Sequence, residues 1–345
     1  MVIDRSSANA SRIPVVRVVN LEKVFDGRIH AVDKISFDVF EGEVFGFLGP
    51  NGAGKTTTIS MLTTLTVPTS GSAEVLGLEV TDRPAEVRKV IGLVPQDLTV
   101  DDDLTGRENM ELQATLYHVP AAVAKPRIDE LLDLVGLTEP QDRYVKTYSG
   151  GMRKRLELAE GLIHRPRILF LDEPTLGLDV QTRASIWEHI RKLKSETNMT
   201  IFMTTHYLEE ADSLCDRIAI IDHGKIVALE SPENLKKAVG GDIIDLEFIS
   251  CNESILDDIK GLPEVALIHG KCEGNRVKVR VPDSGVALPR ILSMLFEKKI
   301  GIVSVSVRKP SLDQAFLEYT GKNLRDDEGG FDRAAAALQS RRRRG

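Results

Sequence analysis

Hydrophobic and polar residues alternate along the first part of this chain. Ile35, Phe37 and Val39 are separated from one another by single polar residues, the pattern of a β-strand with one buried face. Similar short runs fill the rest of residues 15–48. A glycine-rich loop follows at 49–54, and we expect a threonine-rich helix directly after it.

Continuous apolar runs occur later, at residues 168–171, 199–203 and 218–221. Runs of this kind are typical of parallel strands that are buried on both faces. Before them lie segments with apolar residues at three- and four-residue spacing, which predicts helices. Strands that alternate with helices predict a parallel α/β sheet. The expected helices cover residues 108–116, 125–135 and 151–163.

The pattern changes after Gly240–Gly241, where strict alternation returns around residues 244–248, 277–281 and 303–307. Helical stretches lie between these strands, so we expect a βαββαβ unit with one further helix, which is a ferredoxin-like accessory domain. The helical stretches cover residues 253–260, 286–299 and 312–319.

These patterns divide the chain into four segments. The two ends are polar, and the last stretch is low in complexity, with four consecutive arginines at Arg341–Arg344, so we expect both ends to lack fixed structure. The segments are a flexible N-terminus at 1–12, a first domain at 13–240 with a helical subdomain at about 97–165, an accessory domain at 241–321, and a disordered tail at 322–345.

Composition narrows the class of protein. The formal net charge is −7 and the isoelectric point is about 5.6, so bulk charge gives no reason to expect a nucleic-acid partner. Cys215, Cys251 and Cys272 are scattered without a CxxC pair, which disfavours a zinc site or a disulfide framework and suits a reducing cytosol. A long uncharged stretch at 56–73 is rich in threonine and serine and does not predict a membrane span. If the chain serves a membrane process, we expect another polypeptide to cross the bilayer.

Residues 49–56 match the pattern G-x-x-x-x-G-K-[ST], and they lie between an expected strand and an expected helix. Glycines allow the backbone to direct several N–H groups at phosphate oxygens, and the helix start adds its positive end. Lys55 would reach the β- and γ-phosphates, and the Thr56 hydroxyl would bind Mg²⁺. This context makes a chance glycine turn a poor alternative. The predicted nucleotide contacts are Gly49, Pro50, Asn51, Gly52, Ala53, Gly54, Lys55, Thr56 and Thr57.

An acidic pair, Asp172 and Glu173, directly follows the apolar run at 168–171. A carboxylate at a strand end beside a phosphate loop can hold Mg²⁺ through water molecules. The adjacent carboxylate can polarise an attacking water. In isolation the pair would be read as a turn before Pro174, and the phosphate loop favours the roles in binding Mg²⁺ and water.

A second helix start that contains glycine is expected at Ser149, Gly150, Gly151 and Met152. Alone, this short string usually indicates a turn. One phosphate group needs only one helix N-terminus from each chain, so a second one suggests that it serves the nucleotide of another chain.

Taken together, the motifs resemble those of ABC (ATP-binding cassette) ATPases over residues 15–235. The resemblance implies an ABC cassette with a parallel-sheet core, an antiparallel β subdomain and a helical subdomain. It also implies ATP and Mg²⁺ as ligands and a dimer in which each chain completes the other's site. The motifs in chain order are Phe25, residues 49–56, Gln96, residues 148–152, Asp172–Glu173, Asp179 and His206.

The resemblance assigns a role to residues whose function is not evident in isolation. Phe25 would stack on adenine, Gln96 would contact Mg²⁺ or the attacking water, and His206 would contact the γ-phosphate. Outside this context each would be read as an ordinary core, surface or structural residue. The implied catalytic residues are Glu173, His206 and Gln96; the implied Mg²⁺ residues are Thr56, Gln96 and Asp172; and the residues implied to reach the other chain's site are Ser149, Gly150, Gly151, Met152 and Asp179.

The chain departs from the commonest pattern of the family at two motifs. Phe25 stands where tyrosine is more usual, which keeps a stacking face and removes a hydroxyl. The signature string reads YSGGM where LSGGQ is commonest, so Met152 stands in place of a glutamine.

Two longer strings, YSGGMRKRLELA and KPSLDQAFLEYTG, resemble ATPases of the ABC-2 export class, above all the daunorubicin-resistance type of drug exporter. That class implies a second ABC ATPase subunit, most simply an identical chain, and a separate multi-span permease. It implies a cytoplasmic protein at the inner face of the membrane that powers export of a drug, lipid or other amphipathic substrate.

Two alternatives remain open at this stage. One is a non-transport ABC ATPase of translation, DNA repair or iron–sulfur assembly, although members acting on ribosomes usually carry two cassettes and DNA-repair members insert long coiled coils. The other is an importer ATPase, whose C-terminal domain is more often a β-barrel. The transported substrate is not encoded in any motif of this chain.

Overall fold

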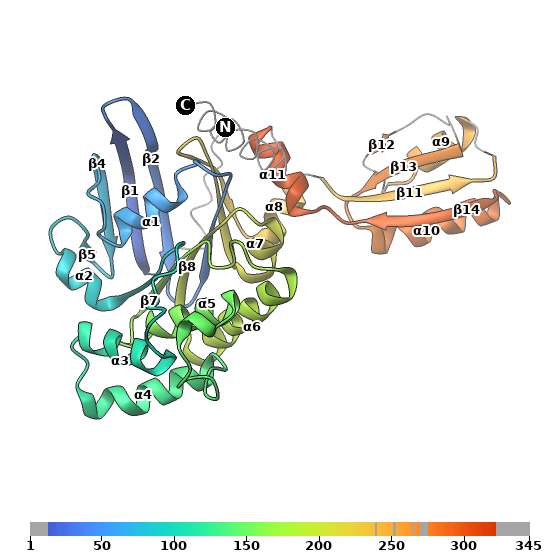
Figure 1. The fold of residues 1–345 in the computed structure, drawn as a ribbon. Helices are drawn as coiled ribbons and strands as arrows, with labels where there is room; N and C mark the ends of the chain where they lie inside the picture. Colours follow the sequence, from blue (N-terminus) through green and yellow to red (C-terminus); the bar gives the residue numbers. More distant parts are fainter. Residues whose placement is uncertain are drawn as a thin grey trace, which may run out of the picture. The chain divides into compact units, whose positions relative to one another are not determined.

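The computed structural model describes residues 13–321, apart from 239, 251–252, 264, 266 and 270–274. The described residues form two units, one that ends at Ser231 and one that begins at Pro232 (Figure 1). The N-terminus expected to be flexible at 1–12, and the tail at 322–345, lie outside the described residues.

An antiparallel sheet begins the first unit, with the strand order β2-β1-β4-β5. Strand β1 pairs with both β2 and β4, and the alternating residues Ile35, Phe37 and Val39 of β2 are buried. The alternation in the sequence therefore predicts the buried face correctly. The strands are β1 (Pro14–Phe25), β2 (Ile29–Phe40), β4 (Ser70–Val75) and β5 (Leu78–Glu79).

A six-stranded sheet forms the centre of the same unit, in the order β10-β9-β3-β8-β7-β6. All neighbouring strands are parallel except the β9–β10 hairpin. The expected parallel α/β sheet is thus confirmed. The strands are β3 (Val44–Leu48), β6 (Ile91–Val94), β7 (Ile168–Asp172), β8 (Thr200–Thr205), β9 (Arg217–Asp222) and β10 (Lys225–Glu230).

The core of this unit is rich in phenylalanine. Phe37, Phe45, Phe47 and Phe202 contact one another with ring centroids 5.2–6.1 Å apart. Because strands β3, β7 and β8 run parallel, their carboxyl ends lie at one edge of the sheet, and such edges are where α/β proteins place their ligands. β3, β7 and β8 each end at a motif singled out in the sequence.

The helices of the first unit follow the expected periodicity, and their ends differ by a few residues. Thr105 and Glu108 form a capping box that starts α3. Helix α4 begins four residues earlier than its periodicity predicts and contains Pro126 in its second turn. The helices are α1 (Lys55–Leu62), α2 (Pro84–Val90), α3 (Gly106–Leu116), α4 (Ala121–Leu134), α5 (Gly150–Glu160), α6 (Val180–Thr197) and α7 (Leu208–Leu214).

The second unit contains a four-stranded antiparallel sheet in the order β12-β13-β11-β14. With two helices in the connections, this is the ferredoxin-like arrangement that the sequence predicts. Ile244, Leu246 and Phe248 on the central strand are buried with Ile291 and Leu295. The elements are α8 (Pro232–Ala238), β11 (Asp242–Phe248), α9 (Glu253–Lys260), β12 (Leu267–His269), β13 (Arg276–Val281), α10 (Ser284–Glu297), β14 (Ile302–Arg308) and α11 (Leu312–Thr320).

The division between the units corrects the sequence analysis, which placed it at Gly240–Gly241. The structure places it at Ser231–Pro232, because α8 packs against α11 and belongs to the second unit. The glycine pair marks the turn before β11 and not the domain boundary.

Within the described residues, no helix has both the length and the apolar composition that crossing a membrane requires.

Candidate nucleotide-binding site

The loop after β3 has the backbone that a phosphate-binding loop requires. Gly54 has φ of +104°, and a side chain there would place its Cβ 2.3 Å from the carbonyl oxygen of Ala31. At Gly49 a Cβ would lie 2.3 Å from the carbonyl oxygen of Ile221. Both positions therefore need glycine on steric grounds. Helix α1 begins directly after the loop, so its free N–H groups face the same place as the loop backbone.

Lys55 is buried at the first position of α1. Its ammonium group donates hydrogen bonds to the carbonyl oxygens of Gly49 at 2.7 Å and Pro50 at 3.0 Å. It also forms an ion pair with Glu173, with Nζ and Oε1 3.0 Å apart. The side chains are 4% and 6% exposed, so two opposite charges are held together away from water.

Asp172 ends β7 and faces the phosphate loop. Its Oδ1 accepts a hydrogen bond from Thr56 Oγ1 at 3.3 Å and a second from the Thr204 hydroxyl. Burial raises the pKa of Asp172, and these two hydrogen bonds oppose that shift. A carboxylate next to a threonine hydroxyl is an all-oxygen donor set, which is the kind that Mg²⁺ prefers.

Glu173 has a left-handed backbone, with φ of +46°, which turns its side chain away from that of Asp172. Its N–H donates to Thr204 Oγ1 at 3.0 Å, and its Oε2 lies 2.9 Å from His206 Nδ1. Burial acts to raise the pKa of Glu173, but the hydrogen bond from His206 and the charge of Lys55 outweigh it and lower the pKa. Glu173 is therefore ionised and able to accept a proton.

The structure thus brings Lys55, Thr56, Asp172, Glu173 and His206 into one connected cluster. They come from α1, from the end of β7 and from the residue after β8. These parts of the chain are far apart in sequence and meet because the parallel strands end at the same edge.

Phe25 and Gln96 lie outside this hydrogen-bonded cluster. Phe25 ends β1 with 41% of its surface exposed, and the ammonium of Lys23 lies 5.1 Å from its ring centroid. An exposed aromatic ring is available for stacking on a base. Gln96 is exposed two residues after β6, and its backbone carbonyl accepts a bond from Lys154 Nζ at 3.4 Å.

Ser149 starts α5 as its N-cap, and its Oγ accepts a hydrogen bond from the N–H of Met152 at 3.3 Å. Asp179 caps α6 in the same way and accepts from the N–H of Thr182 at 3.0 Å. The two caps are neighbours, because a Cβ on Gly151 would lie 2.3 Å from the Thr182 methyl group. In the part of the chain that the structure describes, no hydrogen bond or ion pair joins Ser149–Met152 to the cluster around Lys55. The signature helix therefore presents its start separately from the phosphate loop of its own chain.

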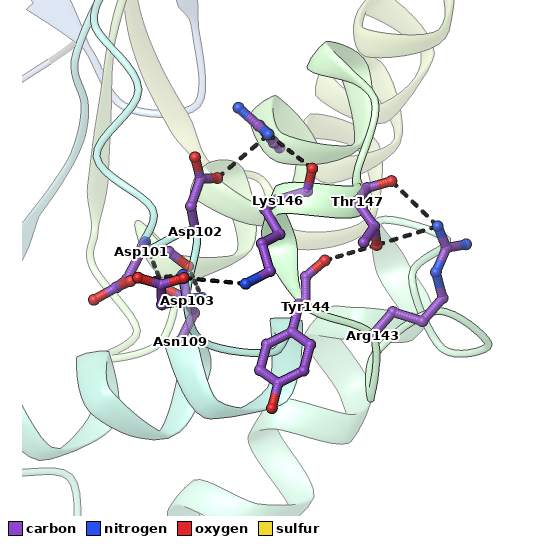
Figure 2. A network of polar contacts seen from close by, with 9 residues as sticks. Asp101, Asp102, Asp103, Asn109, Arg143, Tyr144, Lys146 and Thr147 are labelled. Carbon is purple, nitrogen blue, oxygen red and sulfur yellow. Dashed lines mark hydrogen bonds and ion pairs between the residues drawn. The ribbon is translucent and has the colours of Figure 1, made fainter.

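A polar network holds the segment before Ser149 in place (Figure 2). Lys146 Nζ pairs with Asp103 at 3.2 Å, and the N–H of Asp103 donates to the Asp101 carboxylate at 2.9 Å. Arg143 donates to the carbonyl oxygen of Thr147 at 3.2 Å. These contacts join the loop before α3 to the segment that leads into α5, so the position of the signature string is determined by both.

Three residues of the site were not predicted from the sequence. Thr204 links Asp172 to the backbone of Glu173, and Lys154 and Glu157 connect α5 to the loop after Gln96. Lys154 Nζ donates to the carbonyl oxygen of Pro95 at 2.7 Å and to Glu157 Oε2 at 3.0 Å. Two features of the sequence could have identified these residues. One is a threonine at the end of an apolar strand, and the other is a lysine–glutamate pair at i, i+3 on the buried side of a helix.

Comparison with known proteins shows to which family this chain belongs. The family model described as ABC transporter matches residues 32–176, and the one described as ATP-binding protein DrrA1-3-like, C-terminal domain, matches residues 231–320. A daunorubicin resistance ATP-binding protein, DrrA2 of Streptomyces coeruleorubidus, is 42% identical over 317 residues, which are 91% of this chain and 97% of that protein. This chain is an ATP-binding protein of the ABC transporter family. As a member, it binds ATP and hydrolyses it.

A second relative and a solved structure support the same assignment. The linearmycin resistance ATP-binding protein LnrL of Bacillus subtilis (strain 168) is 37% identical over 319 residues, which are 90% of this chain and all of that protein. The dimeric post-hydrolysis structure of the ATP-binding cassette MJ0796, bound to ADP and Pi, superposes with a TM-score of 0.57 at 26% identity. The superposition covers 63% of this chain and 98% of the MJ0796 chain. The C-terminal match begins at residue 231, which agrees with the domain boundary in the structure.

Proposed function

We propose that this ABC ATPase powers the export of a drug or other amphipathic compound through a separate membrane permease. Two relatives that match nearly the whole chain are named for resistance to such compounds, daunorubicin and linearmycin. The chain lies at the inner face of the membrane and works with a second ABC ATPase subunit, most simply an identical chain. The observation that carries the export proposal is the match of nearly the whole chain to these resistance proteins, and the connected cluster of Lys55, Glu173 and His206 beside the phosphate loop supports the hydrolysis that would drive it.

The residues of the cluster have distinct roles in hydrolysis. Lys55 gives up its contact with Glu173 for the β- and γ-phosphates of ATP, and Glu173 is then free to polarise the attacking water. His206 faces Glu173 through Nδ1, so its Nε2 is the ring nitrogen for the γ-phosphate. Phe25 stacks on adenine, and Gln96 contacts the attacking water or the metal.

Thr56 and Asp172 would hold Mg²⁺, and Gln96 would be the third residue to contact it. Their adjacent hydroxyl and carboxylate oxygens fit this ion. When bound, Mg²⁺ neutralises part of the phosphate charge.

The second phosphate-binding helix start belongs to the ATP of the partner chain. Ser149, Gly150, Gly151 and Met152 form it, and Asp179 lies beside it at the start of α6. The support is that Ser149 caps a helix of its own that is not bonded to the cluster around Lys55. The dimeric state of the MJ0796 cassette is consistent with such sharing.

Replacing Glu173 by Gln tests the proposal. The shape is kept and the base is lost, so ATP binding should persist while hydrolysis falls by on the order of 10²–10⁴. The trapped ATP state should run as a dimer on a sizing column. In cells that express the chain with its permease, the same change should abolish resistance to the exported drug. Hydrolysis near the wild-type rate would show that another group is the base.

Neither the non-transport alternative nor the importer alternative is favoured. The second unit matches the C-terminal domain of DrrA-like proteins, and its ferredoxin-like sheet differs from the β-barrel expected of an importer ATPase.

A further inference from the structure

Strand β14 is an edge strand of the C-terminal sheet and carries no charge between Ile302 and Val307. Its neighbour in the sheet is β11 on one side. Proteins usually protect an edge strand with charged residues or proline, because its free N–H and C=O groups can pair with another chain. Arg308 ends the strand, and its guanidinium is bonded to Asp245 of β11. The edge from Ile302 to Val307 lacks this protection.

A row of valines makes the edge apolar as well as unprotected. Val303, Val305 and Val307 are 60%, 36% and 39% exposed. Val305 lies opposite Leu246 and Val307 opposite Ile244 in the sheet. Those two neighbours on β11 are at most 1% exposed. The valines therefore extend the apolar face of the sheet beyond its core.

The intervening serines lie on the other face. Ser304 Oγ donates to Glu247 at 2.9 Å, and Glu247 is also paired with Arg276. The charge of Glu247 is thus neutralised within the chain.

The sequence Val303-Ser-Val-Ser-Val307 reads the same in both directions. In an antiparallel pair of two such strands centred on Val305, Val303 of one chain faces Val307 of the other, and Ser304 faces Ser306. Arg308 faces Ile302, so no two like charges are opposed. A surface that matches itself about a two-fold axis is what an isologous dimer contact requires.

We propose that β14 pairs with β14 of a second copy of this chain, which joins the two C-terminal sheets into one antiparallel sheet. Backbone hydrogen bonds hold the strands, and the two valine rows meet on one face. One strand pair is a small interface, but the chain also carries the ATPase unit. The contact rests on the proposed function, in which two cassettes come together and raise the effective concentration of the two sheets.

Cysteine cross-linking tests the register. In a chain whose three native cysteines are replaced by alanine, Val305→Cys should form a disulfide-linked dimer under mild oxidation. The two Cα atoms at the axis would be about 4.5–5.5 Å apart, which a disulfide can span. Val307→Cys is the matched control, because its two copies would lie roughly 14 Å apart along the strands. A mixture of the Val303→Cys and Val307→Cys chains should cross-link, and neither variant should cross-link when it is tested alone.

The outcomes separate this inference from the proposed function. The cross-linking is performed without nucleotide and with ATP in a Glu173→Gln background. If the ATP-trapped dimer forms on the sizing column and Val305→Cys gives no more disulfide than Val307→Cys, the β14 contact is overturned and the proposed function stands. Specific cross-linking without any ATP-dependent dimer supports the contact and contradicts the shared ATP site.

A second variant covers the case in which the cysteine-free chain does not fold. Val305→Lys in the native background places a charge at the axis, opposite its own copy. It should raise the dissociation constant of the nucleotide-free dimer at least about tenfold while ATP binding is unchanged. Val286→Lys, at an exposed position on α10, is the control for the same change away from the edge. Equal dimerisation of both variants, measured by sedimentation, would overturn the contact. It would also be overturned if β14 bound a different macromolecule, with binding abolished by Val305→Lys and kept by Val286→Lys.

Discussion

At the scale of single residues, Glu160 is a buried acid whose pKa lies far above its ordinary value. It lies at the end of α5, buried and near Glu157. Burial and the charge of Glu157 raise the pKa of Glu160 to about 8. The carboxyl is therefore protonated at neutral pH, when an exposed glutamate would be ionised.

We predict that Glu160 makes the first unit less stable as the pH rises from about 4.5 to about 8. In this window the folded chain keeps the proton that the unfolded chain has lost, so rising pH favours unfolding. The slope from this one group is at most about 1.4 kcal/mol per pH unit. Glu160→Gln mimics the protonated form and should remove the slope.

The measurement is urea unfolding of the wild type and of Glu160→Gln at pH 6, 7 and 8. Glu139→Gln, at an exposed position, is the control for the same chemical change. A wild-type and a Glu160→Gln chain with parallel pH dependence would show that Glu160 is ionised in the folded state.

The sequence predicts single residues well where a motif carries them. Lys55, Asp172 and Glu173 were named from their strings, and the structure joins them with His206. Thr204 was missed because its role arises from the neighbouring strand: it bonds Asp172 and the Glu173 backbone across the β7–β8 pair. Strand order is not visible in a sequence, so contacts across strands are not either.

At the scale of elements, Lys154 and Glu157 join α5 to the loop that carries Gln96. Both side chains are buried, at 6% and 1% exposure, and they are paired with each other. Lys154 donates to the carbonyl oxygen of Pro95, and Glu157 accepts from the hydroxyl of Thr99 at 3.0 Å. The helix of the signature string and the loop of Gln96 therefore cannot shift independently without breaking these bonds.

We predict that Lys154→Met destabilises the first unit by about 3–5 kcal/mol, because it leaves the buried Glu157 without its partner. The double change Lys154→Met with Glu157→Leu should recover most of that loss, since both charges are gone. Urea unfolding measures both. Lys192→Met, at an exposed position on α6, is the control.

The double variant also separates stability from function. It lacks the bonds between α5 and the Gln96 loop. Its rate of ATP hydrolysis should therefore stay at least about tenfold below the wild-type rate, although the fold is restored, because small displacements of active-site groups slow catalysis by such factors. A stable double variant with full ATPase activity would mean that these bonds serve folding alone.

Periodicity predicts elements reliably in this chain, while their ends and borders depend on packing. The βαββαβ order was predicted from three cleanly alternating strands and the helical stretches between them, and the structure has the ferredoxin-like order. The short strand β12 was not located from its own residues. The boundary was placed nine residues too late because α8 looks like a continuation of the first domain. Only its contact with α11, about seventy residues later, shows where it belongs.

At the scale of the whole molecule, the proposed sharing of ATP sites between two chains predicts that two defective chains can repair each other. Lys55→Ala removes the phosphate-loop lysine, and Ser149→Arg blocks the signature helix. Heterodimers of the two should contain one intact site and one doubly defective site. A mixture should therefore regain ATPase activity relative to either variant alone, measured with heterodimers separated by two affinity tags. Heterodimers without activity would contradict site sharing.

The division into two units leads to the last prediction, that the second unit does no chemistry and holds two ATPase chains together. Every residue of the phosphate-binding cluster lies before Ser231, and β10, the last strand of the central sheet, ends at Glu230. A fragment of residues 1–231 therefore contains every described residue of the first unit. It should bind ATP with a dissociation constant within about tenfold, or 1.4 kcal/mol, of the full-length value.

Removal of the second unit should affect dimerisation differently from ATP binding. In the proposed shared sites, bound ATP bridges the two cassettes, so the second unit should contribute most to dimerisation in the nucleotide-free stage of the cycle. Sedimentation without nucleotide should show full-length dimers and fragment monomers, and ATP should bring the fragment of a Glu173→Gln chain back to a dimer. A cut at Gly241 is the informative comparison, because it leaves α8 on the fragment without its partner α11 and should lower solubility without changing ATP affinity. A folded 1–231 fragment that fails to bind ATP would show that the second unit contributes to the nucleotide site itself.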